Sequence, residues 1–186
     1  MPMLMYKKPF LGKLLSTITI FTVSTSLSYA GLFYMGPSLE YESVKGDDSS
    51  YQTLSPRLTL GYAEKLDYPY YLAGELFAVA GNISGHPDDS GLKNTPSFGI
   101  AILPGMMISD NTFLYGRLGT ITTDFSAADS YTWGGQIGAG IETAITDTWD
   151  IRTEYIFTQY GELNGDSSMG SPHSNTVAIG VIHRFK

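Results

Sequence analysis

Bulky apolar side chains alternate with small or polar ones along most of this chain. In the stretch WDIRTEYIF (149–157), the odd positions carry Trp, Ile, Thr, Tyr and Phe, whereas the first even positions carry Asp, Arg and Glu. A period of two places successive side chains on opposite faces of a β-strand. The stretch therefore predicts a strand with one apolar face and one charged face.

Eight segments share this alternation, whereas apolar residues at helical spacing are nearly absent. The segments are longer than the usual strand of about five to six residues. They approach the roughly nine to eleven residues that cross a bilayer at a tilt. We predict strands over 32–42, 52–64, 70–81, 97–108, 113–125, 132–145, 149–160 and 175–185.

The connections between these segments alternate in length. The segments 65–69, 109–112 and 146–148 are short and rich in the Asp, Asn, Thr and Pro that tight turns require. The other connections tend to be longer and polar. Barrels of bacterial outer membranes have this asymmetry, with short periplasmic turns at one rim and longer external loops at the other. The loop pattern therefore favours a transmembrane barrel over a soluble meander.

The second face of the strands is polar but lacks the long charged side chains of a surface in water. It consists mostly of Gly, Ala, Ser and Thr with isolated charges. Small residues suit the inside of a barrel whose interior just holds its own side chains. We therefore expect lipid to contact Ile151 and its odd-numbered neighbours Trp149, Tyr155 and Phe157, and the lumen to hold Arg152 and Glu154.

Aromatic residues gather near both predicted ends of the strands. Those near the short turns are Tyr62, Tyr70, Trp149 and Phe185, and those near the longer connections are Tyr41, Tyr131, Trp133 and Phe157. Two aromatic girdles around an aliphatic band are typical of the two lipid interfaces. The alternative, a secreted soluble barrel of the lipocalin type, would place the apolar face inside. We predict an all-β, eight-stranded, antiparallel up-and-down transmembrane β-barrel over 31–186.

Residues 1–30 have the layout of a cleavable signal peptide. Lys7, Lys8 and Lys13 precede an apolar segment, and Ser28-Tyr29-Ala30 provides small residues at the positions that a signal peptidase reads. A retained membrane helix is the alternative, but the apolar part is short and contains many Ser and Thr. Cleavage would remove three Lys and no acid, so the 11 basic and 18 acidic residues would become 8 and 18, a net charge of −10.

This composition excludes several classes of function. An acidic chain lacks the basic surface that displaces counterions from phosphates, so we expect no nucleic-acid partner. The absence of Cys excludes disulfides and thiolate metal sites. The mean hydropathy of −0.02 excludes a bundle of membrane helices but is compatible with strands that are only half apolar.

Four segments carry a resemblance to a known family: GLFYMGPSLEY (31–41), GIAILPGMMISDNTFLYGRLG (99–119), GAGIETAITDTWDIRTEYIFTQYG (138–161) and VAIGVIHRF (177–185). In their order and spacing they resemble the small outer-membrane β-barrels of Gram-negative bacteria, such as the transmembrane domain of OmpA, OmpX and opacity-type surface antigens. The resemblance covers essentially all of 31–186. It implies a location in the outer membrane and contact with lipid, lipopolysaccharide and, during insertion, the barrel-assembly machinery.

The resemblance also implies an assembly signal at the C-terminal end. Members of the family usually end on an aromatic residue that the assembly machinery reads. Here Lys186 follows Phe185, and His183 stands where an aromatic residue is common. We expect Val181, His183 and Phe185 to form the signal in this chain.

The charged residues of the predicted lumen face form a candidate network. Neighbouring strands tend to offer opposite signs, and charges removed from bulk water require partners. We expect a structural network in which loss of Arg152 would strongly destabilise the barrel. A gate for a narrow ion path is the alternative that the resemblance to OmpA suggests. The network residues are Glu40, Arg57, Glu75, Arg117, Glu142, Arg152 and Glu154, with Glu42 and Arg184 as further lumen charges.

The longer connections carry repeated acidic positions followed by Ser. Oxygen ligands of this kind could hold Ca²⁺ or bridge divalent ions to lipopolysaccharide phosphates, but such residues are more often turn formers. We expect exposed surface loops and no metal site. The residues are Asp47, Asp48, Asp88, Asp89, Asp129 and Asp166.

Little in the sequence indicates catalysis. The chain has three His, and we expect His86 and His173 in external loops. The motif PHS (172–174) resembles the His and Ser of outer-membrane lipid A deacylases, but its spacing differs. We expect that the protein binds no cofactor and is not an enzyme.

The predicted function is that of a surface protein with a structural or interaction role in adhesion, antigenicity or envelope integrity, with a possible host or cell-surface ligand. The alternatives are a small gated pore and a lipid-modifying enzyme.

Overall fold

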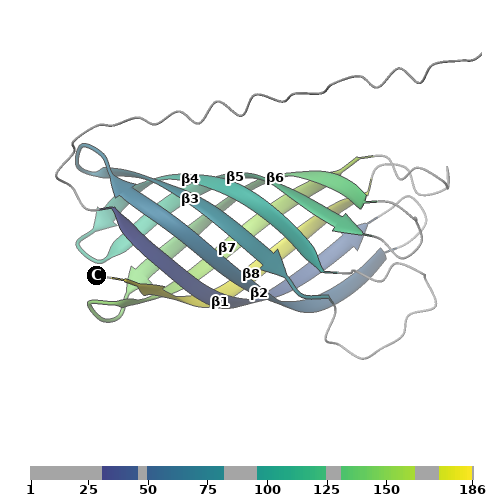
Figure 1. The fold of residues 1–186 in the computed structure, drawn as a ribbon, viewed down its shortest axis with the longest axis horizontal. Coiled ribbons are helices and arrows are strands. Elements are labelled where there is room, and N and C mark those ends of the chain that lie inside the picture. The colour runs from purple at the N-terminus through teal and green to yellow at the C-terminus, as the bar shows by residue number, and fades with distance from the viewer. Residues whose placement is uncertain (1–30, 46–49, 82–95, 125–130, 162–171, 186) are drawn as a thin grey trace, which may run out of the picture.

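The computed structural model describes residues 31–45, 50–81, 96–124, 131–161 and 172–185 (Figure 1). Within these ranges no helix is long and apolar enough to cross a membrane. The predicted signal peptide (1–30) lies outside them. The described residues form eight strands: β1 Leu32–Lys45, β2 Ser50–Lys65, β3 Tyr70–Val79, β4 Ser97–Ser109, β5 Thr112–Asp124, β6 Tyr131–Ala144, β7 Trp149–Tyr160 and β8 His173–Arg184.

Each strand pairs antiparallel with the next one, and β8 pairs with β1 to close the barrel (Figure 1). The paired positions followed once around the barrel from His173 lead back to β8 at His183, ten positions further along the chain. With strands about 4.8 Å apart and about 3.3 Å per residue, this stagger corresponds to a strand tilt of about 40°. Closure leaves no unpaired edge strand, as a lipid environment requires.

The predicted strands are confirmed, and their ends differ from the observed ones by three residues or fewer. The largest difference is at β1, which was predicted to end at residue 42 and continues to Lys45. Lys45 pairs with both Ser50 and His173, so partners on either side extend the strand beyond its apolar alternation.

Three tight turns lie at the rim that also carries the C-terminal end (Figure 1). In the β2–β3 turn, the Tyr70 amide donates to the Asp67 carbonyl at 2.8 Å. In the β6–β7 turn, the Trp149 amide donates to Thr146 Oγ1 at 3.0 Å. The Thr146 side chain therefore satisfies a backbone group released where a strand ends, whereas the contact in the β2–β3 turn joins main-chain groups.

The apolar face of the strands points away from the barrel. Leu58, Ile151, Ile179 and Val181 are 46%, 43%, 60% and 37% exposed, respectively. A soluble barrel of the lipocalin type would bury these four residues together, so the structure excludes that alternative.

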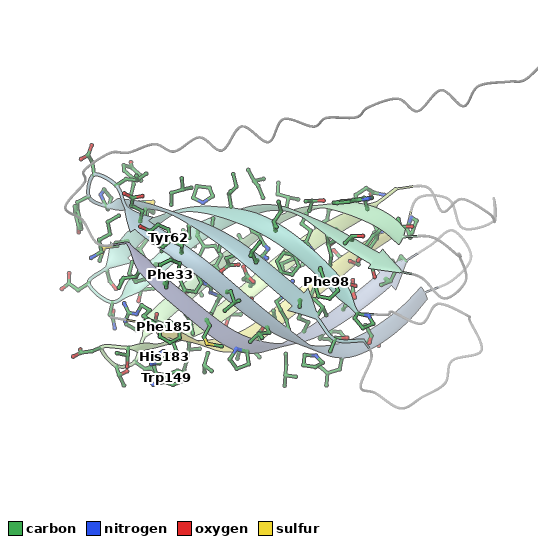
Figure 2. The ribbon with its side chains drawn as sticks, viewed as in Figure 1. Phe33, Tyr62, Phe98, Trp149, His183 and Phe185 are labelled. Atoms are coloured by element: carbon green, nitrogen blue, oxygen red, sulfur yellow. The ribbon has the colours of Figure 1, made fainter. Side chains whose placement is uncertain are left out.

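Outward-facing aromatic side chains mark the short-turn rim (Figure 2). The His183 ring lies between Trp149 and Phe185, with centroids 4.6 and 4.9 Å away, and the Phe33 and Tyr62 rings are 4.9 Å apart. Near the opposite rim, Tyr41, Phe98 and Trp133 are exposed. Phe157 is half-buried, and the side chain of Tyr131 lies outside the described residues.

Large aromatic side chains inside the barrel lie over glycines of the adjacent strand. A Cβ atom added at Gly61 would lie 2.2 Å from the Tyr34 ring, and Gly61 is the residue paired directly with Tyr34. The absence of a side chain therefore gives each ring its space. The aromatic–glycine pairs are Tyr34–Gly61, Tyr71–Gly105, Phe77–Gly99, Tyr115–Gly140 and Tyr160–Gly134.

Candidate functional site

A continuous chain of ion pairs runs through the lumen, in which carboxylates and guanidinium groups alternate. The structure brings together all seven residues of the predicted network, and they come from six of the strands. In order, the chain is Glu40, Arg57, Glu154, Arg117, Glu75, Arg152 and Glu142.

Arg117 is the middle of this network. Its Nη1 lies 2.9 Å from Glu75 Oε2 and 2.9 Å from Glu154 Oε1. The Arg117 side chain is fully buried. A buried charge is stable only when it is paired and hydrogen-bonded, so these two contacts hold β3, β5 and β7 together across the lumen.

The two ends of the network are held by neighbouring strands. Arg57 Nη2 lies 2.5 Å from Glu40 Oε1, and its Nη1 lies 3.3 Å from Glu154 Oε2. At the other end, Arg152 binds Glu75 and places its Nη2 2.6 Å from Glu142 Oε2. Each Arg in the network therefore bridges two carboxylates.

Aromatic rings support the same guanidinium groups. Arg57 and Arg117 lie 4.6 and 4.8 Å from the centroid of the Phe77 ring, and Arg152 lies 5.3 Å from both Tyr34 and Tyr115. Cation–π contacts of this kind contribute about 0.5–2 kcal/mol each, with the higher values in desolvated sites. Three of the rings that lie over glycines, those of Tyr34, Phe77 and Tyr115, therefore also contact the guanidinium groups of the network.

Most of these pairs cross the lumen, although the sequence suggested pairing between neighbouring strands. Glu40–Arg57 and Glu142–Arg152 do join neighbours. Arg57, however, is opposite Val79 rather than Glu75. The offset is four residues, or about 13 Å along the strand, which is too far for an ion pair. Glu75 therefore pairs with Arg117 on β5 and Arg152 on β7, and Arg57 finds its second carboxylate on β7.

Asp150 and Glu42 also lie inside the barrel, beyond the network. Asp150 is fully buried and pairs with Arg184 at 2.9 Å near the short-turn rim. Toward the opposite rim, Glu42 accepts a hydrogen bond from the Tyr160 hydroxyl at 3.3 Å. Asp150 was missing from the predicted network residues, although it shares the even-numbered face of Arg152 and Glu154. That alternation was the signal that could have identified it.

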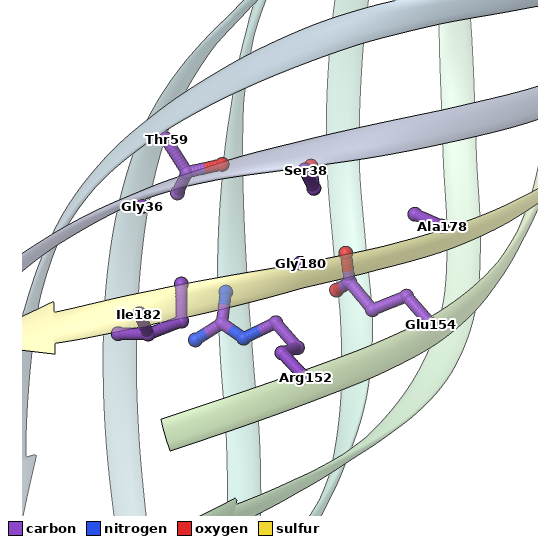
Figure 3. A pocket seen from close by; sticks show the side chains of 8 residues that line it. All are labelled: Gly36, Ser38, Thr59, Arg152, Glu154, Ala178, Gly180 and Ile182. Carbon is purple, nitrogen blue, oxygen red and sulfur yellow. The ribbon is translucent and has the colours of Figure 1, made fainter. Parts of the chain in front are cut away.

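The spaces beside the network are small. One void of about 10 Å³ lies next to Arg152 and Glu154, between Gly36, Gly180 and neighbouring residues (Figure 3). Another of about 10 Å³ lies next to Arg57, with Gln136 and Tyr160 in its wall. A void of this size holds about one water molecule. The middle of the described lumen is therefore filled by its own side chains.

Most of the other predicted site residues are not among those that the structure describes. Asp47, Asp48, Asp88, Asp89, Asp129 and Asp166 lie outside the described residues, as does His86. The prediction of an external loop for His173 is wrong, because His173 begins β8 and pairs with Lys45 and Gln159. Among the described residues, no group of three or more His, Cys, Asp or Glu could hold a metal ion.

The residues of the expected assembly signal lie on the outer wall of β8 and just beyond it. Val181 and Phe185 are exposed, and His183 is half-buried between its two aromatic neighbours. Their side chains thus form one outward-facing row, whose role in assembly stays a prediction.

Comparison with known proteins connects this closed, charge-filled barrel to a family. Residues 14–185 match the family described as outer membrane protein beta-barrel domain. The chain belongs to this family. A barrel of this family lies in the outer membrane of Gram-negative bacteria, as the exposed aliphatic band already indicated. No curated protein matches the sequence.

Solved structures share the barrel fold at low sequence identity. The crystal structure of Neisserial surface protein A (NspA) is 20% identical, with a TM-score of 0.58 over 82% of this chain and 97% of that chain. The attachment invasion locus protein Ail of Yersinia pestis is 16% identical, with a TM-score of 0.56 over 83% of this chain and 99% of that chain. A second Ail structure, in complex with the heparin analogue sucrose octasulfate, is 15% identical, with a TM-score of 0.54 and the same coverage.

Proposed function

We propose that this protein acts as a surface protein of the outer membrane, with a structural or interaction role in adhesion, antigenicity or envelope integrity. The observation that carries the proposal is the lumen, which buried ion pairs fill from Glu40 to Glu142. A barrel with a filled lumen anchors the chain in the membrane. The longer connections are then the segments that we propose to act outside the cell. The proposed role is noncatalytic.

The partners that we propose follow from the two surfaces of the barrel. The exposed aliphatic band fits lipid tails, and its rim fits the lipopolysaccharide of the outer leaflet. The outward row of Val181, His183 and Phe185 is the surface that we propose for the assembly machinery. A host or cell-surface ligand would contact the longer connections.

The charge of these connections limits the kind of surface ligand. The segments 46–49, 82–95, 125–130 and 162–171 together contain seven acidic residues and one Lys, Lys93. One related barrel was solved with a heparin analogue, which is a polyanion. Like charges repel, so we expect this chain to bind a basic surface of a partner rather than a sulfated glycan.

Cell adhesion provides the test of this role. Neutralising Asp47, Asp48, Asp88 and Asp89 to Asn is expected to reduce adhesion of bacteria that display the protein by several fold. The control neutralises Asp67, Asp110 and Asp147, which lie in the short turns at the other rim. Adhesion that is equal with and without the protein, or equally reduced by both sets, would contradict the proposal.

Planar-bilayer recordings test the rival role of a pore. Voids that hold about one water each do not carry a hydrated ion, so the purified barrel is expected to give no conductance steps above the baseline. The control is a variant with Arg117 and Phe77 both replaced by Ala, which removes the fully buried middle of the network. Regular steps from the unmodified protein would favour the gated pore instead.

A further inference from the structure

A cavity of about 300 Å³ occupies the end of the lumen nearest the short turns. It lies between the charge network and the short turns, and Arg152 and Glu142 form part of its wall. An open hollow of about 630 Å³ at the mouth shares Lys65, Phe113 and Arg184 with it. The cavity is therefore reached from the periplasmic side, unlike the voids of about 10 Å³ beside the network.

Apolar and aromatic side chains form most of the cavity wall. The Tyr71 and Phe113 rings meet edge to face with centroids 5.3 Å apart, and they come from β3 and β5. Pockets of about 300–1,000 Å³ with apolar walls and a few polar groups are the usual form of small-molecule sites. The other apolar wall residues are Leu32, Tyr34, Ala63, Ala73 and Leu103.

The carboxylate inside the cavity already has a partner. Arg152 donates to Glu142 Oε2 from Nε at 2.8 Å, and its Nη2 is 2.6 Å from the same atom. A cationic ligand would have to compete with this guanidinium for Glu142. Burial of a second cation beside Arg152 is strongly unfavourable without a new carboxylate.

Lys65 and Arg184 are the two cations nearest the mouth, and the Lys65 side chain is exposed. Arg184 contacts Asp150 and the Thr146 carbonyl through Nη2, and its Nε–H is buried without a hydrogen-bond partner. Lys65 shares the lumen face of β2 with Ala63, whereas Glu64 belongs to the opposite face by alternation, although it also lines the cavity. Asp110 and Asp147 border the outer hollow and not the inner cavity.

We propose that this cavity is a binding site, open to the periplasm, for a small amphipathic carboxylate with an aromatic or branched aliphatic body. The body lies between Tyr34, Tyr71 and Phe113, and the carboxylate lies at the mouth, where it accepts hydrogen bonds from Lys65 and Arg184. The volume of about 300 Å³ is at the small end of the range for ligand pockets, which suits a compact body the size of phenylacetate rather than a long acyl chain.

Titration of 4-fluorophenylacetate by ¹⁹F NMR tests the proposal, with the full barrel in lipid nanodiscs and empty nanodiscs as the baseline for partition into lipid. Saturable binding is expected. Ala73→Leu fills the cavity and is expected to weaken binding about tenfold or more. Ala78→Leu adds the same side chain to the lipid face of the same strand, so binding is expected to be unchanged.

The position of the carboxylate is tested separately. Lys65→Gln is expected to weaken binding about threefold, the range of a solvent-accessible ion pair, and Lys45→Gln at the other rim to leave it unchanged. The neutral analogue 2-(4-fluorophenyl)ethanol is expected to bind more weakly than the carboxylate. Equal affinity of the two probes would overturn the assignment of a carboxylate. Equal effects of Ala73→Leu and Ala78→Leu would overturn the location, and the absence of saturable binding would overturn the site itself.

Discussion

Arg152→Ala is expected to lower the free energy of unfolding of the barrel by about 3–5 kcal/mol, the usual cost of removing one partner from a buried ion pair. The substitution leaves Glu142 without its guanidinium and removes one of the two Arg that hold Glu75. It also removes a cation that lies 5.3 Å from both the Tyr34 and Tyr115 rings. The expected loss of stability therefore comes from a carboxylate left without its partner and from the lost contacts between the guanidinium and the two rings.

Urea unfolding of the detergent-folded protein, followed by the fluorescence of Trp133 and Trp149, measures this effect. Lys45→Ala at the exposed end of β1 is the control and is expected to change stability by less than about 0.5 kcal/mol. Adding Glu142→Gln to Arg152→Ala is expected to restore about 1 kcal/mol or more, because the unpaired carboxylate is then gone. Unchanged stability of Arg152→Ala would show that water reaches the network.

Gly180→Val is expected to prevent the barrel from closing, or to destabilise the closed form by more than about 3 kcal/mol. Gly180 lies in β8, at the seam where the last strand meets the first. A Cβ atom there would lie 2.5 Å from the Pro37 carbonyl oxygen and 2.5 Å from Ser38 Cβ, both on β1. Backbone atoms cannot turn aside as a flexible side chain can, so β1 and β8 would have to separate.

The matched control for this substitution is Gly135→Val in β6. A Cβ atom at Gly135 meets nothing within 4 Å, and the residue lies on the lipid face. Folding is measured by the shift in gel mobility between unheated and boiled samples, which distinguishes the closed barrel from the unfolded chain. We expect the shift to be retained in Gly135→Val and lost or reduced in Gly180→Val. Equal behaviour of the two variants would mean that the seam tolerates a side chain.

Local alternation explains why so much of the architecture could be predicted. A strand places every second residue on the same face wherever it lies in the fold, so the sequence already placed Ile151 outside and Arg152 inside. The short polar turns were equally local, since Asp67 and Thr146 satisfy backbone groups within a few residues of themselves. Neither inference required knowledge of the partner strands.

The partners inside the lumen could not be predicted in the same way. Glu75 binds Arg117 and Arg152, which follow it by 42 and 77 positions, and Arg57 binds Glu154 across 97. These contacts depend on the register of every strand pair between them. They also depend on the offset of ten residues along β8 that separates the start and the end of one circuit of paired positions around the barrel.

The sequence by itself determined the strands, their two faces and the set of charges that the lumen would contain, because side-chain direction in a strand is a property of neighbouring residues. Only the tertiary structure decided that these charges join into one chain, that the aromatic rings lie over glycines, and that a cavity remains beside Tyr71 and Phe113. The physical reason is closure: the distances across a lumen are set by the number and stagger of all the strands together, and no single segment encodes them.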